Sequence, residues 1–109
     1  MMADIVSYLE LICERFAQPQ IRAAFRGFTK TIQFTFPDLR RDFILSIAED
    51  GSATLAEHIV PQPDVRVTTS SKTLAGIVDG TVNPFQAYII RKLKVEGQME
   101  DLLRLQKLL

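Results

Sequence analysis

The residues that could carry out chemistry are few and widely spaced along the chain. The single histidine, His58, has no second histidine, cysteine or carboxylate at the spacing of a metal site. The single cysteine, Cys13, falls on an apolar helix face, where an inert thiol is the usual outcome. Glu10 and Glu14 lie one helical turn apart on a polar face, unlike a carboxylate pair in a pocket. We therefore expect no catalytic residue, no metal and no cofactor.

Two other groups of residues are of types found in phosphate-binding or catalytic sites. Gly76 and Gly80 do not form a phosphate-binding loop after a strand, and no dinucleotide-binding pattern is present. Tyr8, Tyr88 and His58 are the side chains closest to an acid or base for a small α+β isomerase acting on an apolar substrate. This enzyme is kept as an alternative to a protein without catalysis.

The basic residues do not indicate a polyanion partner. Lysine and arginine number 13, as do aspartate and glutamate, so the formal net charge is zero and nucleic-acid binding is not expected. Arg22, Arg26, Arg40 and Arg41 could meet anionic head groups or phosphates. Charged faces are usually solvated, and we expect a solvated surface here.

Length and composition indicate one folded domain over residues 1–109. The content of hydrophobic residues is 47%, which argues against disorder. No run approaches the roughly 18 apolar residues of a membrane span, although transient membrane contact is compatible with the sequence. The chain begins without a basic segment followed by an apolar stretch, and it has one cysteine, so we expect a cytoplasmic location.

Apolar periodicity predicts two helices at the start of the chain. Residues 4–18 repeat apolar side chains at helical spacing, and Asp4 is a plausible N-cap. Pro19 ends this helix and can open a second one, in which Ile21 and Phe25 align.

The period then changes to two, which is typical of strands. We predict strands over residues 31–36, 43–47, 53–60 and 64–69. Asp50-Gly51 favours a hairpin turn between the second and third.

Capping residues predict the remaining elements. Ser70 or Ser71 can cap a helix that Gly80 closes. Asn83-Pro84 starts another helix, and a strand over residues 93–95 follows it. Phe85, Tyr88 and Ile89 are expected to line the inner side of the helix that begins at Pro84.

The last predicted element is an amphipathic helix that runs to Leu109. Its apolar residues cover an arc of roughly 220°, where an ordinary surface helix needs about 100°. These residues are Met99, Leu102, Leu103, Leu105, Leu108 and Leu109. The excess must be buried against a partner subunit, a membrane or an apolar ligand.

About five helices and five strands, with hairpin-spaced strands after a helical pair, predict an α+β fold. We expect a five-stranded mixed, largely antiparallel sheet covered on one face by about five helices.

Several segments, in this order and spacing, resemble the sterol carrier protein 2 family, the SCP-2 sterol transfer domain. They are residues 43–51 and 65–70, Leu74 to Gly80, Asn83-Pro84, Ala87, residues 92–97 and residues 105–108. The resemblance implies an apolar tunnel between sheet and helices. It also implies non-catalytic binding or transfer of fatty acids, fatty acyl-CoA, phospholipids or sterols.

The chain departs from the family pattern at two positions. Arg91 stands where the family usually has glycine before its lysine-leucine pair, and glycine there would relax the turn. Phe43 appears at the position where many members carry tryptophan, and it still supplies an aromatic wall.

The resemblance makes a set of apolar residues candidates for lining a lipid site. These are Phe25, Phe28, Phe34, Phe43, Phe85, Tyr88, Ile89, Leu102, Leu103 and Leu105. Gln106 projects into the middle of the apolar arc and could hold a lipid head group at the tunnel mouth. The alternative is an interaction domain whose terminal helix packs on a second copy or on a larger partner. The protein is expected to be a monomer or a homodimer.

Overall fold

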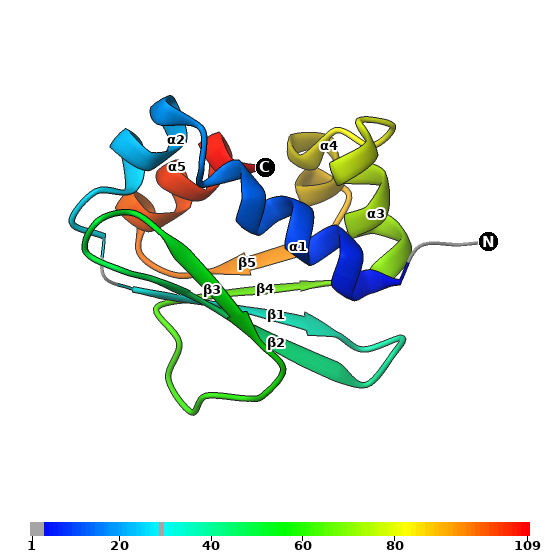
Figure 1. Ribbon diagram of the computed structural model, residues 1–109. Helices are drawn as coiled ribbons and strands as arrows, with labels where there is room; N and C mark the ends of the chain where they lie inside the picture. The colour runs from blue at the N-terminus through cyan, green and yellow to red at the C-terminus, as the bar shows by residue number, and fades with distance from the viewer. Residues whose placement is uncertain (1–3, 29) are drawn as a thin grey trace.

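The computed structural model describes residues 4–28 and 30–109, and its described helices cover one face of a single sheet (Figure 1). The strand order is β3-β2-β1-β4-β5. The strands are β1 (Thr31–Phe36), β2 (Arg41–Ile47), β3 (Ala53–Ala56), β4 (Val65–Thr69) and β5 (Leu93–Glu96). β1 pairs in parallel with β4, and the other three pairings are antiparallel. The predicted mixed, largely antiparallel sheet is confirmed.

Five helices are seen in the described residues, as the sequence predicts. They are α1 (Ile5–Arg15), α2 (Pro19–Phe25), α3 (Ser71–Asp79), α4 (Pro84–Ile89) and α5 (Met99–Leu108). The Ser70 hydroxyl accepts a bond from the Thr73 N–H at the start of α3. Gly80 ends α3 in the left-handed conformation with φ of 84°, which glycine adopts without steric cost. Asp4 occupies the N-cap position of α1 but makes no side-chain capping bond.

The third strand is shorter than predicted, because the chain leaves the sheet after Ala56. Residues 57–64 cross the outer face of the sheet, opposite the helices, and bring β4 beside β1 (Figure 1). Gln33 holds this crossing segment. Its Nε2 donates to the carbonyls of Phe43 (2.8 Å) and His58 (3.0 Å), and its Oε1 accepts from the Val60 N–H (2.9 Å). The backbone of this segment is therefore bonded to a side chain, and not to a neighbouring strand.

The turn from α4 into β5 contains Arg91, the position at which the chain departs from the family's usual glycine. Arg91 has φ of 63°, in the left-handed region that favours glycine. The Lys92 N–H then donates to the carbonyl of Ala87 at 2.8 Å, which closes the helix. The backbone of this turn is thus the one that a glycine would adopt, and Arg91 adopts it at a steric cost.

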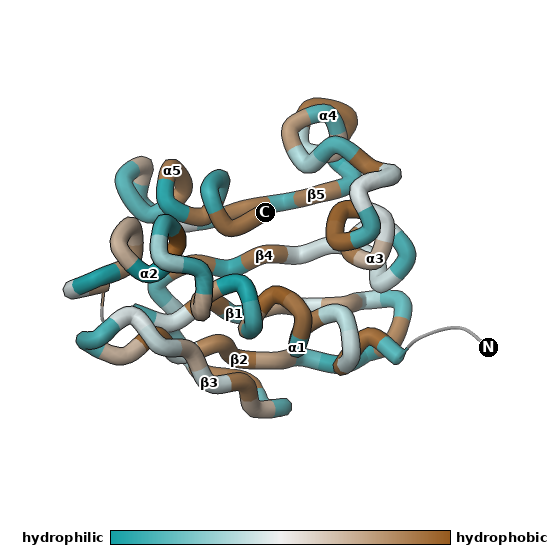
Figure 2. The backbone as a smooth tube through the Cα atoms, turned by 45° about the horizontal axis from the view of Figure 1, so that its top comes forward, coloured by the Kyte–Doolittle hydropathy of each residue, from teal (hydrophilic) through white to brown (hydrophobic). Residues whose placement is uncertain are grey.

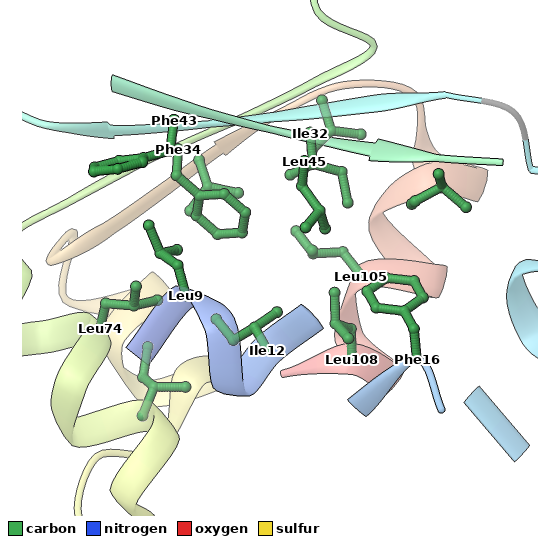
Figure 3. Packing of buried hydrophobic residues seen from close by; sticks show 14 of the residues in the cluster. Leu9, Ile12, Phe16, Ile32, Phe34, Phe43, Leu45, Leu74, Leu105 and Leu108 are labelled. Carbon is green, nitrogen blue, oxygen red and sulfur yellow. The ribbon is translucent and has the colours of Figure 1, made fainter. Parts of the chain in front are cut away.

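The core lies between the sheet and the helices. Side chains from alternate positions of β1 and β2 point toward α1, α3 and α5, as Figure 3 shows for Ile32, Phe34, Phe43 and Leu45. Leu9 and other buried residues of the helices meet them, and together they form one apolar cluster. A tunnel of the kind that the family resemblance implies would run through this layer, which is filled here by packed side chains.

Candidate functional site

The apolar layer between sheet and helices is the first candidate site. Phe25, Phe28, Phe34, Phe43 and Leu105 are buried there, each with at most 3% of its surface exposed. The Phe25 ring contacts the Phe28 ring edge-on, with 5.2 Å between centroids. This layer brings five of the predicted lining residues together, and Leu102 packs against it half-buried.

The other predicted lining residues lie outside the layer. Phe85, Tyr88 and Ile89 of α4 are exposed, so their predicted place on the inner side of that helix is wrong. The reason is that α4 packs on β5 through Ala87, whose small side chain is 2% exposed. With Ala87 facing inward, the large side chains of this short helix turn toward solvent. Leu103 of α5 is exposed as well.

Gln106 is exposed, and so is Met99 on the same part of the helix surface, with 70% of its surface exposed. The role of Gln106 beside a lipid head group at the tunnel mouth stays a prediction. The helix instead buries Leu105, Leu108 and Asp101. Only one side of α5 faces the sheet, so the chain itself leaves part of the apolar arc exposed. Burial of this excess against a partner subunit, a membrane or an apolar ligand stays a prediction.

An ion pair whose carboxylate is buried holds the start of α5, and the sequence analysis missed it. Asp101 is 2% exposed, and both of its carboxylate oxygens accept from the Lys30 ammonium, at 2.9 and 3.0 Å. A buried carboxylate needs such a partner, because losing hydration without one is costly. The signal in the sequence was that Asp101, unlike Glu100, lies on the same side of the helix as the apolar residues Leu105 and Leu108.

Arg15 is a second residue that the sequence analysis did not single out. From the last turn of α1, its guanidinium donates to the carbonyl of Leu108 at 2.8 Å and to that of Val78 at 3.5 Å. These carbonyls lie at the C-terminal ends of α5 and α3, where helix carbonyls lack intrahelical partners. Arg15 thereby joins three helices above the layer.

A groove between α3 and α4 is the second candidate site. Its volume is about 750 Å³. Its lining mixes polar side chains, among them Ser70, Lys72, Thr73, Asn83, Gln86 and Lys92, with the apolar side chains of Ala75, Val82, Ala87 and Ile90.

In the described part of the chain, His58 lies on the opposite face of the sheet from Tyr8 and Cys13 of α1. His58 is exposed on the outer-face crossing segment, and the Tyr8 hydroxyl donates to Asp79 at 3.3 Å on the surface. Burial, with Glu10 and Glu14 nearby, raises the pKa of Cys13 to about 11, so its thiol stays protonated at neutral pH. Within residues 4–28 and 30–109, no group of three or more metal-ligating side chains comes together.

The candidate arginines do not form one anion site. Arg41 pairs with Glu57 at 2.9 Å, which lowers the pKa of that carboxyl, and the Arg22 guanidinium donates to the carbonyl of Phe16. Arg26 and Arg40 are exposed. In the part of the chain that the structure describes, no helix is both long and apolar enough to cross a membrane.

The fold recurs in solved structures. The chain has a TM-score of 0.74 with sterol carrier protein 2 like 2 from Aedes aegypti, at 16% identity, covering 96% of this chain and 95% of that one. The sterol carrier protein domain 2 of Helicoverpa armigera gives a TM-score of 0.76 at 20% identity, with 94% and 82% covered. These likenesses define the class of fold.

A third similar structure is the stereoselective inverting sec-alkylsulfatase Pisa1 from Pseudomonas sp., with a TM-score of 0.67 at 25% identity. The match covers 81% of this chain but only 14% of that enzyme, so this chain corresponds to a small part of it. No curated protein matched the sequence.

The model of the SCP-2 sterol transfer family matches residues 9–109. The chain therefore belongs to this family, whose domains bind lipids and are generally non-catalytic.

Proposed function

We propose that this protein binds an apolar lipid through its acyl chain, without catalysis, and carries it between membranes or to another protein. The observation that supports this proposal most directly is the family match over residues 9–109, together with the apolar layer between sheet and helices. Each methylene transferred from water into such a layer contributes about 0.8 kcal/mol. Fatty acids, fatty acyl-CoA, phospholipids and sterols are the candidate ligands, and the single thiol of Cys13 suits a cytoplasmic protein.

The residues that face the layer are the proposed contacts for the acyl chain. They are Phe25, Phe28, Phe34, Phe43, Leu102 and Leu105. Because side chains already fill the layer, entry of a chain requires the helices to move away from the sheet. Gln106, exposed on α5, is the proposed contact for the polar head. If a Gln106→Leu variant bound lipids with unchanged head-group preference, Gln106 would not contact the polar head.

A single introduced tryptophan tests the location of the acyl chain. The chain has no tryptophan, so Phe43→Trp places one fluorophore in the layer. Titration with a brominated fatty acid should quench this fluorescence in a saturable manner, since bromine quenches only at contact. Native mass spectrometry of the freshly purified wild-type protein should show co-purified lipid.

The matched control places tryptophan on the other side of the sheet. Ile59 is 67% exposed on the outer-face crossing segment, and Ile59→Trp should not be quenched. Equal quenching of both variants, or no quenching of Phe43→Trp in a folded protein, would contradict binding in the layer.

A further inference from the structure

Four of the large apolar side chains that are exposed in the described residues lie together on and directly after α4. Phe85, Tyr88, Ile89 and Ile90 have 65%, 50%, 60% and 57% of their surfaces exposed. We call these four residues the α4 patch. Ala87 is the one buried residue of α4, and it anchors the helix. Exposed apolar groupings of this kind mark surfaces that contact a protein or a membrane.

The α4 patch is held in place by its own backbone and capping bonds. The Asn83 side chain accepts from the N–H groups of Phe85 (2.9 Å) and Gln86 (3.2 Å). At the other end, the Arg91 N–H donates to the Tyr88 carbonyl at 3.2 Å. Figure 2 shows α4 at the margin of the helical layer, beside β5. A capped helix thus holds these apolar side chains in their exposed positions.

Cations predominate around the α4 patch. Residues 81–95 contain Arg91, Lys92 and Lys94 and no acidic residue, and the acidic residues just outside this stretch are Asp79 and Glu96. Asp79 lines the groove between α3 and α4 together with Ile90 and Lys92. Lys94 pairs with Glu96 at 3.1 Å, but both side chains are largely exposed, so the pair is weak. Apolar side chains flanked by cations are the surface that inserts among the head groups of an anionic bilayer.

We propose that the α4 patch docks this protein on a bilayer that contains anionic lipid. A second copy of the chain fits less well, because a symmetric dimer would place the cations of one α4 patch against those of the other. The four side chains are also a small area beside the roughly 800 Å² per partner of a stable protein interface.

The position of the α4 patch connects docking to lipid exchange, a step that rests on the proposed function. Tyr88 and Ile89 border a hollow of about 460 Å³ whose other walls include Leu93 and Val95 of β5. Leu93 belongs to the buried apolar cluster, and Val95 packs against it. A bilayer on the α4 patch would therefore lie next to the edge of the layer that we propose holds the acyl chain.

Vesicle co-sedimentation tests the docking directly. Wild-type protein should sediment with phosphatidylcholine vesicles that contain phosphatidylserine, and far less with phosphatidylcholine alone. A Phe85→Ser/Ile89→Ser variant should bind the anionic vesicles at least about tenfold more weakly, since two large apolar side chains no longer insert. An Arg91→Gly/Lys92→Gln variant should lose about fivefold for each cation removed, and this loss should vanish at high salt.

The matched controls are Ile59→Ser, an equally exposed apolar residue on the opposite face, and Lys107→Gln, an exposed cation of α5. Both should bind vesicles like the wild type. Equal binding to both vesicle types, unchanged binding of Phe85→Ser/Ile89→Ser, or a dimer in light scattering that this variant abolishes would each overturn the proposal. Quenching of Phe43→Trp by free brominated fatty acid is measured without vesicles, so failure of lipid binding and failure of docking are separate results.

Discussion

At the scale of single residues, the fold pairs the polar groups that it buries. Asp101 bonds Lys30, and Gln33 uses both ends of its amide. Within the described ranges, no buried side-chain nitrogen or oxygen lacks a partner. A buried polar group that loses its partner costs about 1–3 kcal/mol, so these pairs fix positions that apolar packing alone would leave adjustable.

The thiol of Cys13 should react slowly. Its pKa of about 11 lies well above that of an ordinary thiol, because half-burial and two glutamates disfavour the thiolate. At pH 8 we expect the folded protein to react with a disulfide reagent at least about a hundredfold more slowly than the protein in urea. The native rate should keep rising with pH up to about 11. A native rate equal to that in urea at pH 8 would contradict this expectation.

At the scale of elements, α4 and α5 are both less buried than their sequences indicate. Each packs through a small part of its surface, Ala87 in α4 and the Leu105–Leu108 side in α5. The remaining apolar surface faces outward. Such helices are the parts of a fold best suited to meet a membrane or a partner, because their exposed side chains make few contacts within the chain.

The turn after α4 allows a test in which two adjacent glycine substitutions have opposite effects. Arg91 has positive φ, so Arg91→Gly should stabilise the protein by about 0.5–1 kcal/mol, the relief of strain exceeding the added entropy of the unfolded chain. Lys92 does not have positive φ, and Lys92→Gly should destabilise it by a similar amount. Urea unfolding measures both. Destabilisation by Arg91→Gly would show that its side chain contributes more than the strain costs.

At the scale of the whole molecule, the crossing segment after β3 makes the sheet mixed. Without it, four antiparallel strands would follow in order, and β4 would not lie beside β1. Gln33 is the side chain that bonds this segment to the outer face. The position of β4, and with it one wall of the apolar layer, depends on that attachment.

A Gln33→Leu substitution should destabilise the fold by about 2–4 kcal/mol, because the carbonyls of Phe43 and His58 and the N–H of Val60 lose their partner. Thr68→Val, on the outer face of β4, is the control and should change stability by less than about 0.5 kcal/mol. The free energy of unfolding in urea measures both. An equal, small effect of the two variants would show that the crossing segment is held by other contacts.

The sequence by itself determined the element order, the caps of α3 and α4, and the family. Alternating Ile32, Phe34 and Phe36, the capping residues Ser70 and Asn83, and Gly80 act locally, so their effects can be read without the fold. The tertiary structure decided which apolar faces are buried. Periodicity shows that Phe85, Tyr88 and Ile89 share a face, but only the packing of Ala87 on β5 turns that face outward. Likewise, pairs such as Lys30 with Asp101 join residues far apart in the chain, and only the folded arrangement brings them together.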